Sequence, residues 1–175
     1  DGSIDTKQIT IPGKVMKQVM GKPLLGYLID RVKLVGSIDE VVVATPVGID
    51  NDVIERYCIE EDIVCYRGSE QDVLDRTLQA LKSVDATVGV EVYGDCPLID
   101  HNVINEAIKK ILNLNLDYVS NTIERTYPDG VDAEVFKKEA LIEADINSTS
   151  PFMREHVTPY ISGKLKKYLP SGEFK

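Results

Sequence analysis

Residues 94–100 carry a carboxylate in a setting that suits metal binding. They follow the run 86–93, whose β-branched residues predict a buried strand, and a proline turns the chain directly afterwards. Asp95 offers oxygen ligands to a cation such as Mg²⁺, and the glycine before it lets a ligand approach the backbone closely. The alternative is an ordinary loop in which Asp100 caps a helix that begins near His101.

Three further loops are expected to meet the Asp95 loop at one edge of a sheet, because parallel strands separated by helices deliver their loops there. Together these loops supply glycine turns, a lysine, an arginine and a helix N-terminus. With the carboxylate, this set can hold a nucleoside triphosphate and Mg²⁺. Neither the G-x-x-x-x-G-K-[ST] nor the G-x-G-x-x-G fingerprint occurs. The converging positions are Gly13, Lys14, Ala44, Thr45, Arg67, Gly68, Ser69, Gly94 and Asp95.

Each of these positions also has an ordinary structural explanation. Lys14 can be a solvated charge, and Ser69 can simply cap the next helix. Asp72 and Arg76 can belong to local pairs along that helix, and His156 is explained equally well by a structural role. No serine lies in a nucleophile elbow and no cysteine has a histidine nearby in sequence, so nucleophilic catalysis finds little support.

Strands and helices alternate through most of the chain. Apolar periodicity predicts strands over 7–11, 39–45, 63–66, 86–93 and 116–120, and a half-exposed strand over 131–136 after a turn at 127–130. It predicts helices over 24–34, 50–61, 101–113 and 138–144, one that Ser69 caps, and one over 152–161 that breaks near Pro159. This order predicts an α/β fold, a three-layer sandwich whose mostly parallel mixed sheet has helices on both faces.

Composition limits the classes of ligand. The 175 residues, 43% hydrophobic and 28% charged, fit a single domain over 1–175 with a C-terminal extension from about residue 163. A formal net charge of -9 repels phosphate backbones and makes nucleic acid an unlikely partner. A polyphosphate ligand would therefore need a metal ion and a few well-placed Lys or Arg side chains.

The three cysteines form no C-x-x-C pair and have no histidine cluster near them, so the sequence does not indicate a zinc site. Their odd number argues against a framework of disulfides and favours a protein of a reducing compartment. No apolar run is as long as a membrane span, and the first residues lack the pattern of a signal peptide. The expected location is the cytoplasm, with no membrane partner.

Seven sets of residues, in order along 12–160, resemble the spore-coat polysaccharide cytidylyltransferase-like proteins, relatives of the acylneuraminate and ketodeoxyoctonate cytidylyltransferases. Taken together they are far more specific than any one of them. They are Pro12-Gly13-Lys14-Val15; Gly21-Lys22-Pro23-Leu24; Val43-Ala44-Thr45; Tyr66-Arg67-Gly68-Ser69 with Asp72-Val73-Leu74-Asp75-Arg76; Gly94-Asp95-Cys96-Pro97-Leu98-Ile99-Asp100; Tyr127-Pro128-Asp129-Gly130-Val131-Asp132; and Arg154-Glu155-His156-Val157-Thr158-Pro159-Tyr160.

The resemblance implies a nucleotidyltransferase fold of the glycosyltransferase-A kind and transfer of CMP from CTP to a small sugar-acid substrate, with Mg²⁺ as cofactor and pyrophosphate as product. It implies catalytic roles for Lys14, over the triphosphate, and for Asp95, at the metal. Asp132 is a candidate second metal ligand because it lies beside a predicted strand. Whether the chain forms a homodimer is left open. The implied nucleotide-binding residues are Pro12, Gly13, Lys14, Ala44, Thr45, Arg67, Gly68, Ser69, Asp72 and Arg76, and the implied sugar-binding residues are Tyr127, Asp129, Arg154, Glu155 and His156.

The first loop departs from the family pattern. The family carries an Arg-x-Gly-Ser-x-Arg stretch just before Pro-Gly-Lys, and here residues 8–11 run into Pro12 without those arginines. Either a loop is missing from this sequence or the protein has lost part of its triphosphate site. Two alternatives to the cytidylyltransferase therefore stay open: a glycosyltransferase that uses a nucleotide sugar, and an inactive nucleotide-binding module.

Overall fold

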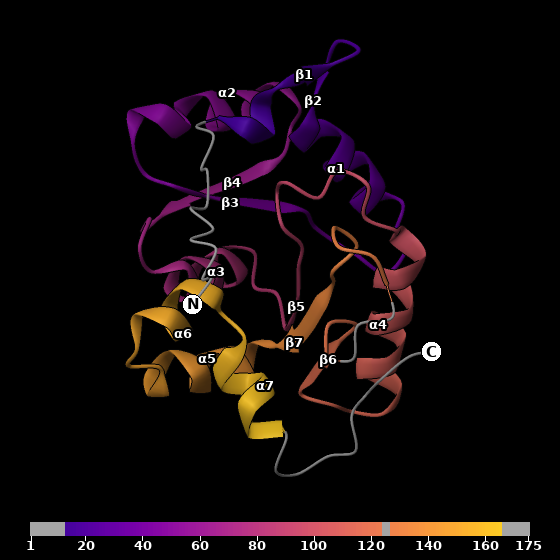
Figure 1. Ribbon diagram of the computed structural model, residues 1–175, viewed down its shortest axis with the longest axis vertical. Helices are drawn as coiled ribbons and strands as arrows, with labels where there is room; N and C mark the ends of the chain where they lie inside the picture. Colours follow the sequence, from indigo (N-terminus) through magenta and orange to yellow (C-terminus); the bar gives the residue numbers. More distant parts are fainter. Residues whose placement is uncertain (1–12, 124–126, 166–175) are drawn as a thin grey trace, which may run out of the picture.

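The computed structural model describes residues 13–123 and 127–165 (Figure 1). The predicted strand over 7–11 and the candidate Pro12 lie outside these residues. The strands are β1 (Gln18–Val19), β2 (Lys22–Pro23), β3 (Val42–Pro46), β4 (Val64–Gly68), β5 (Val88–Glu91), β6 (Tyr118–Ser120) and β7 (Glu134–Lys137). The helices are α1 (Leu24–Lys33), α2 (Asp52–Glu60), α3 (Val73–Ser83), α4 (His101–Asn113), α5 (Lys138–Asn147), α6 (Pro151–His156) and α7 (Pro159–Leu165), with 3-10 turns η1 (Lys14–Met16) and η2 (Ile49–Asn51).

The strands form a mixed arrangement, as predicted. β3 and β4 pair in parallel from Val42↔Val64 to Pro46↔Gly68. β7 lies between β5 and β6 and runs antiparallel to both. Because β5 and β6 both oppose β7, their carboxyl ends lie at the same edge of this sheet.

The prediction for the last strand was wrong in its exposure. The strand was expected half-exposed over 131–136, but β7 begins at Glu134 and its first three residues are buried. β7 lies between β5 and β6, and helices cover both faces of this sheet, so the glutamate enters the interior instead of facing water.

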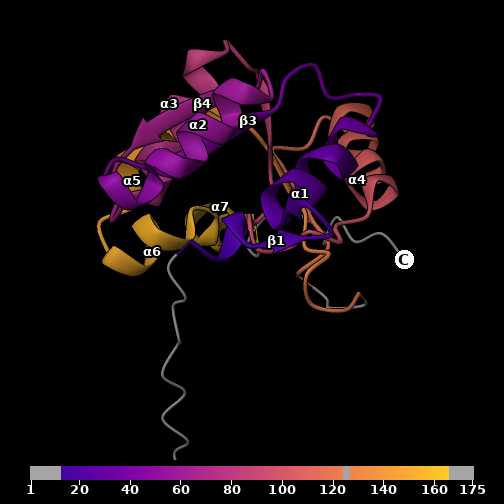
Figure 2. The ribbon, with the colours of Figure 1, turned by 90° about the horizontal axis from the view of Figure 1, so that it is seen from above.

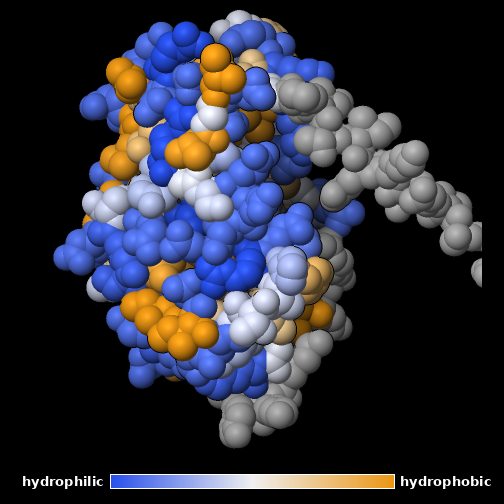
Figure 3. Space-filling model, turned by 90° about the vertical axis from the view of Figure 1, so that its left-hand side faces the viewer, coloured by the Kyte–Doolittle hydropathy of each residue, from blue (hydrophilic) through white to orange (hydrophobic). Residues whose placement is uncertain are grey.

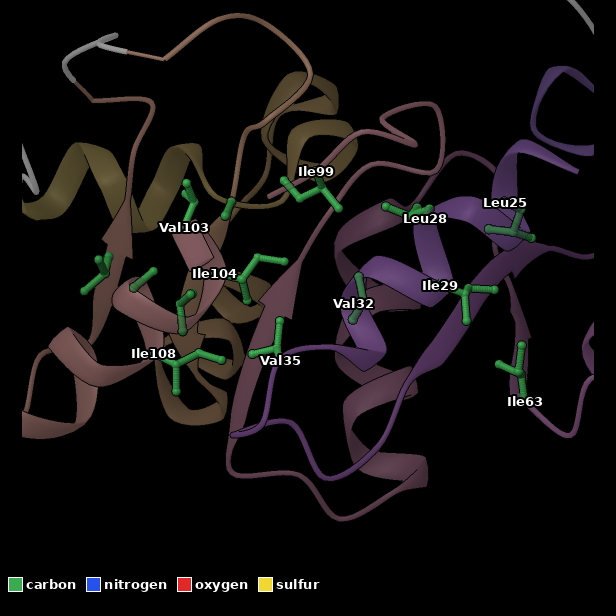
Figure 4. Packing of buried hydrophobic residues seen from close by; sticks show 14 of the residues in the cluster. Leu25, Leu28, Ile29, Val32, Val35, Ile63, Ile99, Val103, Ile104 and Ile108 are labelled. Atoms are coloured by element: carbon green, nitrogen blue, oxygen red, sulfur yellow. The ribbon is translucent and has the colours of Figure 1, made fainter. Parts of the chain in front are cut away.

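Helices cover the three-stranded sheet on both faces, which confirms the three-layer prediction. Val119 and Val135 pack into a cluster with α1, α2 and α4, while Tyr118 and Phe136 pack into another with α3, α5 and α7. Figure 4 shows the first cluster, and Figures 1 and 2 show α1 and α4 on one side and α3, α5 and α6 on the other. The alternation of side chains along β6 and β7 places the core on both sides of the sheet.

One of the two predicted helix N-caps is found in the structure, and the other is displaced. The helix predicted over 101–113 is α4, and Asp100 caps it by accepting from the Asn102 N–H. Ser69 was expected to cap the following helix, but the cap of α3 is Asp72, which accepts from Asp75. Ser69 Oγ instead accepts the Asp72 N–H at 3.0 Å, so the prediction placed the cap three residues too early.

A short hairpin that the sequence analysis missed joins β1 to β2. Met20 and Gly21 occupy its two-residue turn, both with positive φ, 50° and 82°. Two successive positive φ values match a type I′ turn, whose usual Asn-Gly signature is absent here.

The face that α2, α3 and α6 present is mostly hydrophilic, with apolar side chains in separate patches (Figure 3). Exposed apolar residues of α2 and α6 and of the turn before α2 include Ile49, Ile59 and Phe152. None of the described helices combines the length and apolarity that crossing a membrane requires. A homodimer stays a prediction.

Candidate functional site

Two loops predicted to meet do so through an ion pair. Lys14 Nζ lies 2.5 Å from Asp95 Oδ2, and the two side chains are 49% and 47% exposed. Gly13 has φ 66° at the start of η1, a conformation that glycine adopts readily. A side chain at Gly94 would begin 3.4 Å from Val15 Cγ1, so the Val15 side chain also lies close to the Gly94 backbone.

The Asp95 loop is held at both ends. The Cys96 N–H donates to the Tyr93 carbonyl at 2.9 Å and the Ile99 N–H donates to the Cys96 carbonyl at 3.2 Å. Ile99 is fully buried, in the apolar cluster of Figure 4, and Arg31 Nε donates to its carbonyl at 2.6 Å. Asp95 is therefore presented from a fixed turn.

The charges of this loop suit cation binding and not nucleophilic attack. The hydrogen bond from Lys14 lowers the pKa of Asp95 and outweighs the opposing effect of burial, so the side chain is a carboxylate at neutral pH. Burial, and then the Asp95 charge, raise the pKa of the neighbouring Cys96 thiol to about 11. Cys96 is thus a thiol at neutral pH, the unreactive form.

Arg67, a predicted nucleotide-binding residue, is occupied by partners within the fold. Its guanidinium lies 2.6 Å from Glu55 Oε2 and 3.0 Å from Asp52 Oδ1, both on α2. It also donates to the carbonyls of Pro46 at 3.0 Å and Gly48 at 2.8 Å. Arg67 therefore ties the end of β4 to α2 and to the loop that precedes it.

The other candidates on β3 and β4 lie beside Arg67. Thr45 is paired in register with Arg67 and is buried, and Ala44 precedes it along β3. Gly68 is in close contact with α3, since a Cβ there would lie 2.8 Å from Arg76 Cγ. Arg76 Nη1 donates to the Ser69 carbonyl at 2.5 Å. The structure thus gathers these residues, while their contact with a nucleotide stays a prediction.

Arg154, a predicted sugar-binding residue, forms a second ion pair between distant segments. Its Nε and Nη2 donate to the two carboxylate oxygens of Asp72 at 2.9 and 2.5 Å. Its Nη1 lies 2.8 Å from Asp145 Oδ1 and 2.9 Å from the Asp145 carbonyl. Arg154 on α6 therefore holds the cap of α3 and the end of α5 together.

The residues after Arg154 adopt a rare backbone conformation. Glu155 and His156 are exposed, and the His156 ring lies 4.5 Å from that of Phe152, between centroids. Val157 has φ 64° and ψ -62°, and the Thr158 N–H donates across it to the His156 carbonyl at 2.7 Å. This is a γ-turn of the strained form, at a β-branched residue that is buried.

The remaining candidates lie in the turn before β7. Gly130, at the end of the predicted turn at 127–130, has φ 92°, a conformation that glycine adopts readily. Tyr127 packs against the apolar core, and Asp129 is exposed. Asp132 lies two residues before Glu134, and Glu134 accepts a hydrogen bond from the hydroxyl of Tyr93, two residues before Asp95. The segments that carry the two aspartates are therefore joined by a hydrogen bond.

Asp95 and Asp132 are the residues that could hold a metal ion. No group of three or more His, Cys, Asp or Glu suited to a metal occurs within 13–123 and 127–165. Mg²⁺ commonly takes only one or two carboxylates and completes its shell with phosphate oxygens and water. Two carboxylates are therefore enough, by their chemistry, for a Mg²⁺ ion that binds together with a triphosphate, and metal binding by Asp95 and Asp132 stays a prediction.

The sequence analysis missed a buried polar group beside this site. Glu134 accepts hydrogen bonds from the Tyr93 hydroxyl at 3.3 Å and from the Tyr118 hydroxyl at 2.5 Å. Glu91 is its register partner on β5. Burial, and then the Glu134 charge, raise the pKa of Glu91 to about 8. The available signal was one carboxylate within each of two apolar strand runs.

Comparison with known proteins adds a family to this geometry. The chain is 34% identical to an uncharacterized protein of Methanocaldococcus jannaschii over 86% of this chain and 61% of that protein. It is 31% identical to the spore coat polysaccharide biosynthesis protein SpsF of Bacillus subtilis, over 86% of this chain and 64% of SpsF. The chain thus spans less than two thirds of the length of either relative.

A solved structure of a cytidylyltransferase from Leptospira borgpetersenii superposes on the chain with a TM-score of 0.85 and 28% identity. The match covers 91% of this chain and 68% of that one. The family model described as cytidylyltransferase matches residues 10–173, nearly the whole sequence. The chain therefore belongs to the cytidylyltransferase family.

Proposed function

We propose that this protein transfers CMP from CTP to a small sugar acid and releases pyrophosphate, with Mg²⁺ as its cofactor. The observation that carries the proposal is the contact between Lys14 and Asp95, because it joins a cation for phosphate and a carboxylate for metal at one place. Membership of the cytidylyltransferase family supports CTP as the nucleotide. The resemblance to acylneuraminate and ketodeoxyoctonate cytidylyltransferases supports a sugar acid as the acceptor. The three free cysteines favour the cytoplasm.

The reaction asks the protein mainly for positioning and charge neutralisation. A hydroxyl of the sugar acid attacks the α-phosphorus in line, the bond to pyrophosphate breaks, and the hydroxyl loses its proton. Lys14 offsets negative charge on the phosphates, and Asp95 and Asp132 would hold the Mg²⁺. When bound, Mg²⁺ supplies further charge neutralisation at the phosphate oxygens. The fixed Asp95 turn means that little reorganisation is needed as charge develops.

The test is a pyrophosphate-release assay with CTP, Mg²⁺ and a panel of keto-sugar acids. The proposal expects release that requires the acceptor, the metal and CTP together. Absence of pyrophosphate with every acceptor would contradict it. Transfer from a nucleotide sugar, with no reaction of CTP, would instead support a glycosyltransferase.

The unusual first loop favours one other candidate, a nucleotide-binding module without catalysis. The family arginines before Pro12 have no counterpart in this sequence. Calorimetry separates the possibilities: CTP binding without pyrophosphate release would support the module, whereas binding together with release supports the enzyme.

A further inference from the structure

Glu134 is a buried carboxylate in a place that apolar packing does not explain. It is 6% exposed, on a strand whose next two residues are Val135 and Phe136. Directly across the ladder stands Glu91, whose Oε2 atom is buried and has no hydrogen-bond partner. A buried carboxyl group that lacks a full set of hydrogen-bond partners costs stability, whereas an apolar side chain at the same place in the strand would not. The burial of Glu134 beside Glu91 therefore points to a role beyond stability.

The partners of Glu134 connect it to both candidate metal ligands. Tyr93, which donates to Glu134 Oε1 at 3.3 Å, lies two residues before Asp95. Glu134 itself lies two residues after Asp132. The Tyr93–Glu134 hydrogen bond is thus a cross-link between the two segments that carry the carboxylates.

We propose that Glu134 is a positioning residue which, through Tyr93, sets the separation of Asp95 and Asp132 and so prepares the site for the metal–triphosphate complex. This inference rests on the proposed function, because it presumes that the two aspartates share a metal ion. It assigns Glu134 no contact with substrate. A metal that needs a narrow range of ligand positions gains affinity when the carboxylates are already placed.

Tyr118 provides a matched control within the same hydrogen-bonded group. It donates to the other oxygen of Glu134, Oε2, at the shorter distance of 2.5 Å, and it is 4% exposed. It lies on β6, remote in sequence from the Asp95 loop. Tyr93 is 39% exposed and makes the longer bond. If the role of Glu134 is purely structural, loss of the Tyr118 hydrogen bond should have the larger effect. If Glu134 positions the aspartates, metal affinity should depend on the Tyr93 hydrogen bond.

The experiment measures Mn²⁺ affinity by electron paramagnetic resonance in the presence of CTP, with thermal unfolding alongside, for the wild type, Tyr93→Phe and Tyr118→Phe. Tyr93→Phe should weaken Mn²⁺ binding about tenfold with a small change in unfolding temperature, since one bond to a charged group is lost. Tyr118→Phe should lower the unfolding temperature more and leave the Mn²⁺ affinity near that of the wild type.

Two substitutions of Glu134 complete the test. Glu134→Gln keeps a hydrogen-bond acceptor and should retain most of the Mn²⁺ affinity, while Glu134→Leu should reproduce the loss seen in Tyr93→Phe. Equal effects of the two tyrosine variants on Mn²⁺ affinity, or no effect of Tyr93→Phe, would overturn the positioning role of Glu134. The proposed function would still stand in that case if the wild type releases pyrophosphate. A wild type that binds no Mn²⁺ with CTP would overturn both.

Discussion

Two ion pairs of equal length join distant parts of this chain, and they differ in almost everything else. Lys14 Nζ to Asp95 Oδ2 and Arg154 Nη2 to Asp72 Oδ2 both measure 2.5 Å. The first joins two loops and is about half exposed on each side, at 49% and 47%. The second joins two helices and is less exposed, at 20% and 35%, and its arginine also pairs with Asp145. Charged residues of both pairs were predicted site residues.

The difference teaches how to separate a charge that is available for a ligand from one that the fold uses. A half-exposed lysine with one carboxylate partner contributes little stability, so a ligand can replace that partner at low cost. An arginine that meets a carboxylate through two parallel bonds and reaches a third residue fixes geometry strongly. We therefore expect the Lys14–Asp95 pair to be available to a ligand and the Arg154–Asp72 pair to hold α6 against the start of α3.

The largest expected effect is the loss of turnover in Asp95→Asn. The substitution removes a metal charge from the loop, and it should reduce the rate of pyrophosphate release at least about 100-fold. Because the side chain is half exposed, the free energy of unfolding should change by no more than about 0.5 kcal/mol. Asp100→Asn is the matched control, since asparagine also caps helices well. Asp95→Asn with a near-normal rate, or one that unfolds, would return Asp95 to an ordinary structural role.

Arg154→Met should produce the next effect, on stability. It removes charge-assisted bonds to Asp72 and Asp145, and we expect the free energy of unfolding in urea to fall by about 2 kcal/mol. Lys109→Met is the control: it removes an exposed ion pair with Glu106, 2.8 Å long, and should change the free energy of unfolding by less than about 0.5 kcal/mol. An unchanged stability together with a raised KM for the sugar acid would reverse the assignment and support Arg154 as a sugar-binding residue.

Acid should weaken the Arg154–Asp72 pair in a predictable direction. Burial acts to raise the pKa of Asp72, but hydrogen bonds from Arg154 and from the Asp75 N–H outweigh it, so the folded-state pKa is below the ordinary value. Stability from such a group is present above its unfolded pKa, about 3.9, and is lost as pH falls through the folded pKa. Urea unfolding at neutral pH and near pH 3 should therefore show a smaller acid loss for Arg154→Met than for the wild type. Identical losses would show that the pair carries no such linkage.

Lys14→Ala should change stability less than Arg154→Met does. An exposed pair contributes between about 0.2 and 1 kcal/mol, and the alanine variant should lie within that range of the wild type. A loss as large as that of Arg154→Met would mean that the Lys14–Asp95 pair holds the fold, and the distinction between the two pairs would fail.

The sequence predicted elements best where one local signal was decisive. The helix over 101–113 combines a strong apolar period with Asp100 at its start, and no competing cap lies nearby. Before α3, Ser69 and Asp72 were both suitable caps by residue type, and the Asp72 carboxylate that caps the helix is also held by Arg154, 82 residues away. Contacts of that range leave no trace in a local pattern.

The site was predicted where topology alone sufficed. Lys14 and Asp95 follow from the rule that loops after strands gather at one edge, so their meeting needed no knowledge of partners. Arg67 could not be assigned in this way, since its partners Asp52 and Glu55 are set by how α2 packs on β4. Glu134 was misjudged for the same reason, because its burial follows from the pairing of β7 with β5 and β6, which brings Tyr118 of β6 and Tyr93, just after β5, to its carboxylate.

The central claim, that Lys14 serves the triphosphate, is tested most directly by the affinities of Lys14→Ala for CTP and for CMP. A charge-assisted hydrogen bond is worth about 1.5 to 3 kcal/mol, so CTP binding with Mg²⁺ should weaken roughly tenfold to a hundredfold. CMP, which lacks the β- and γ-phosphates, should bind almost as before, and the CTP effect should shrink as salt rises. Lys17→Ala, at an exposed lysine three residues further on, should change neither affinity. Equal weakening of both nucleotides would place Lys14 near the α-phosphate or the ribose, and no change in either would contradict the account.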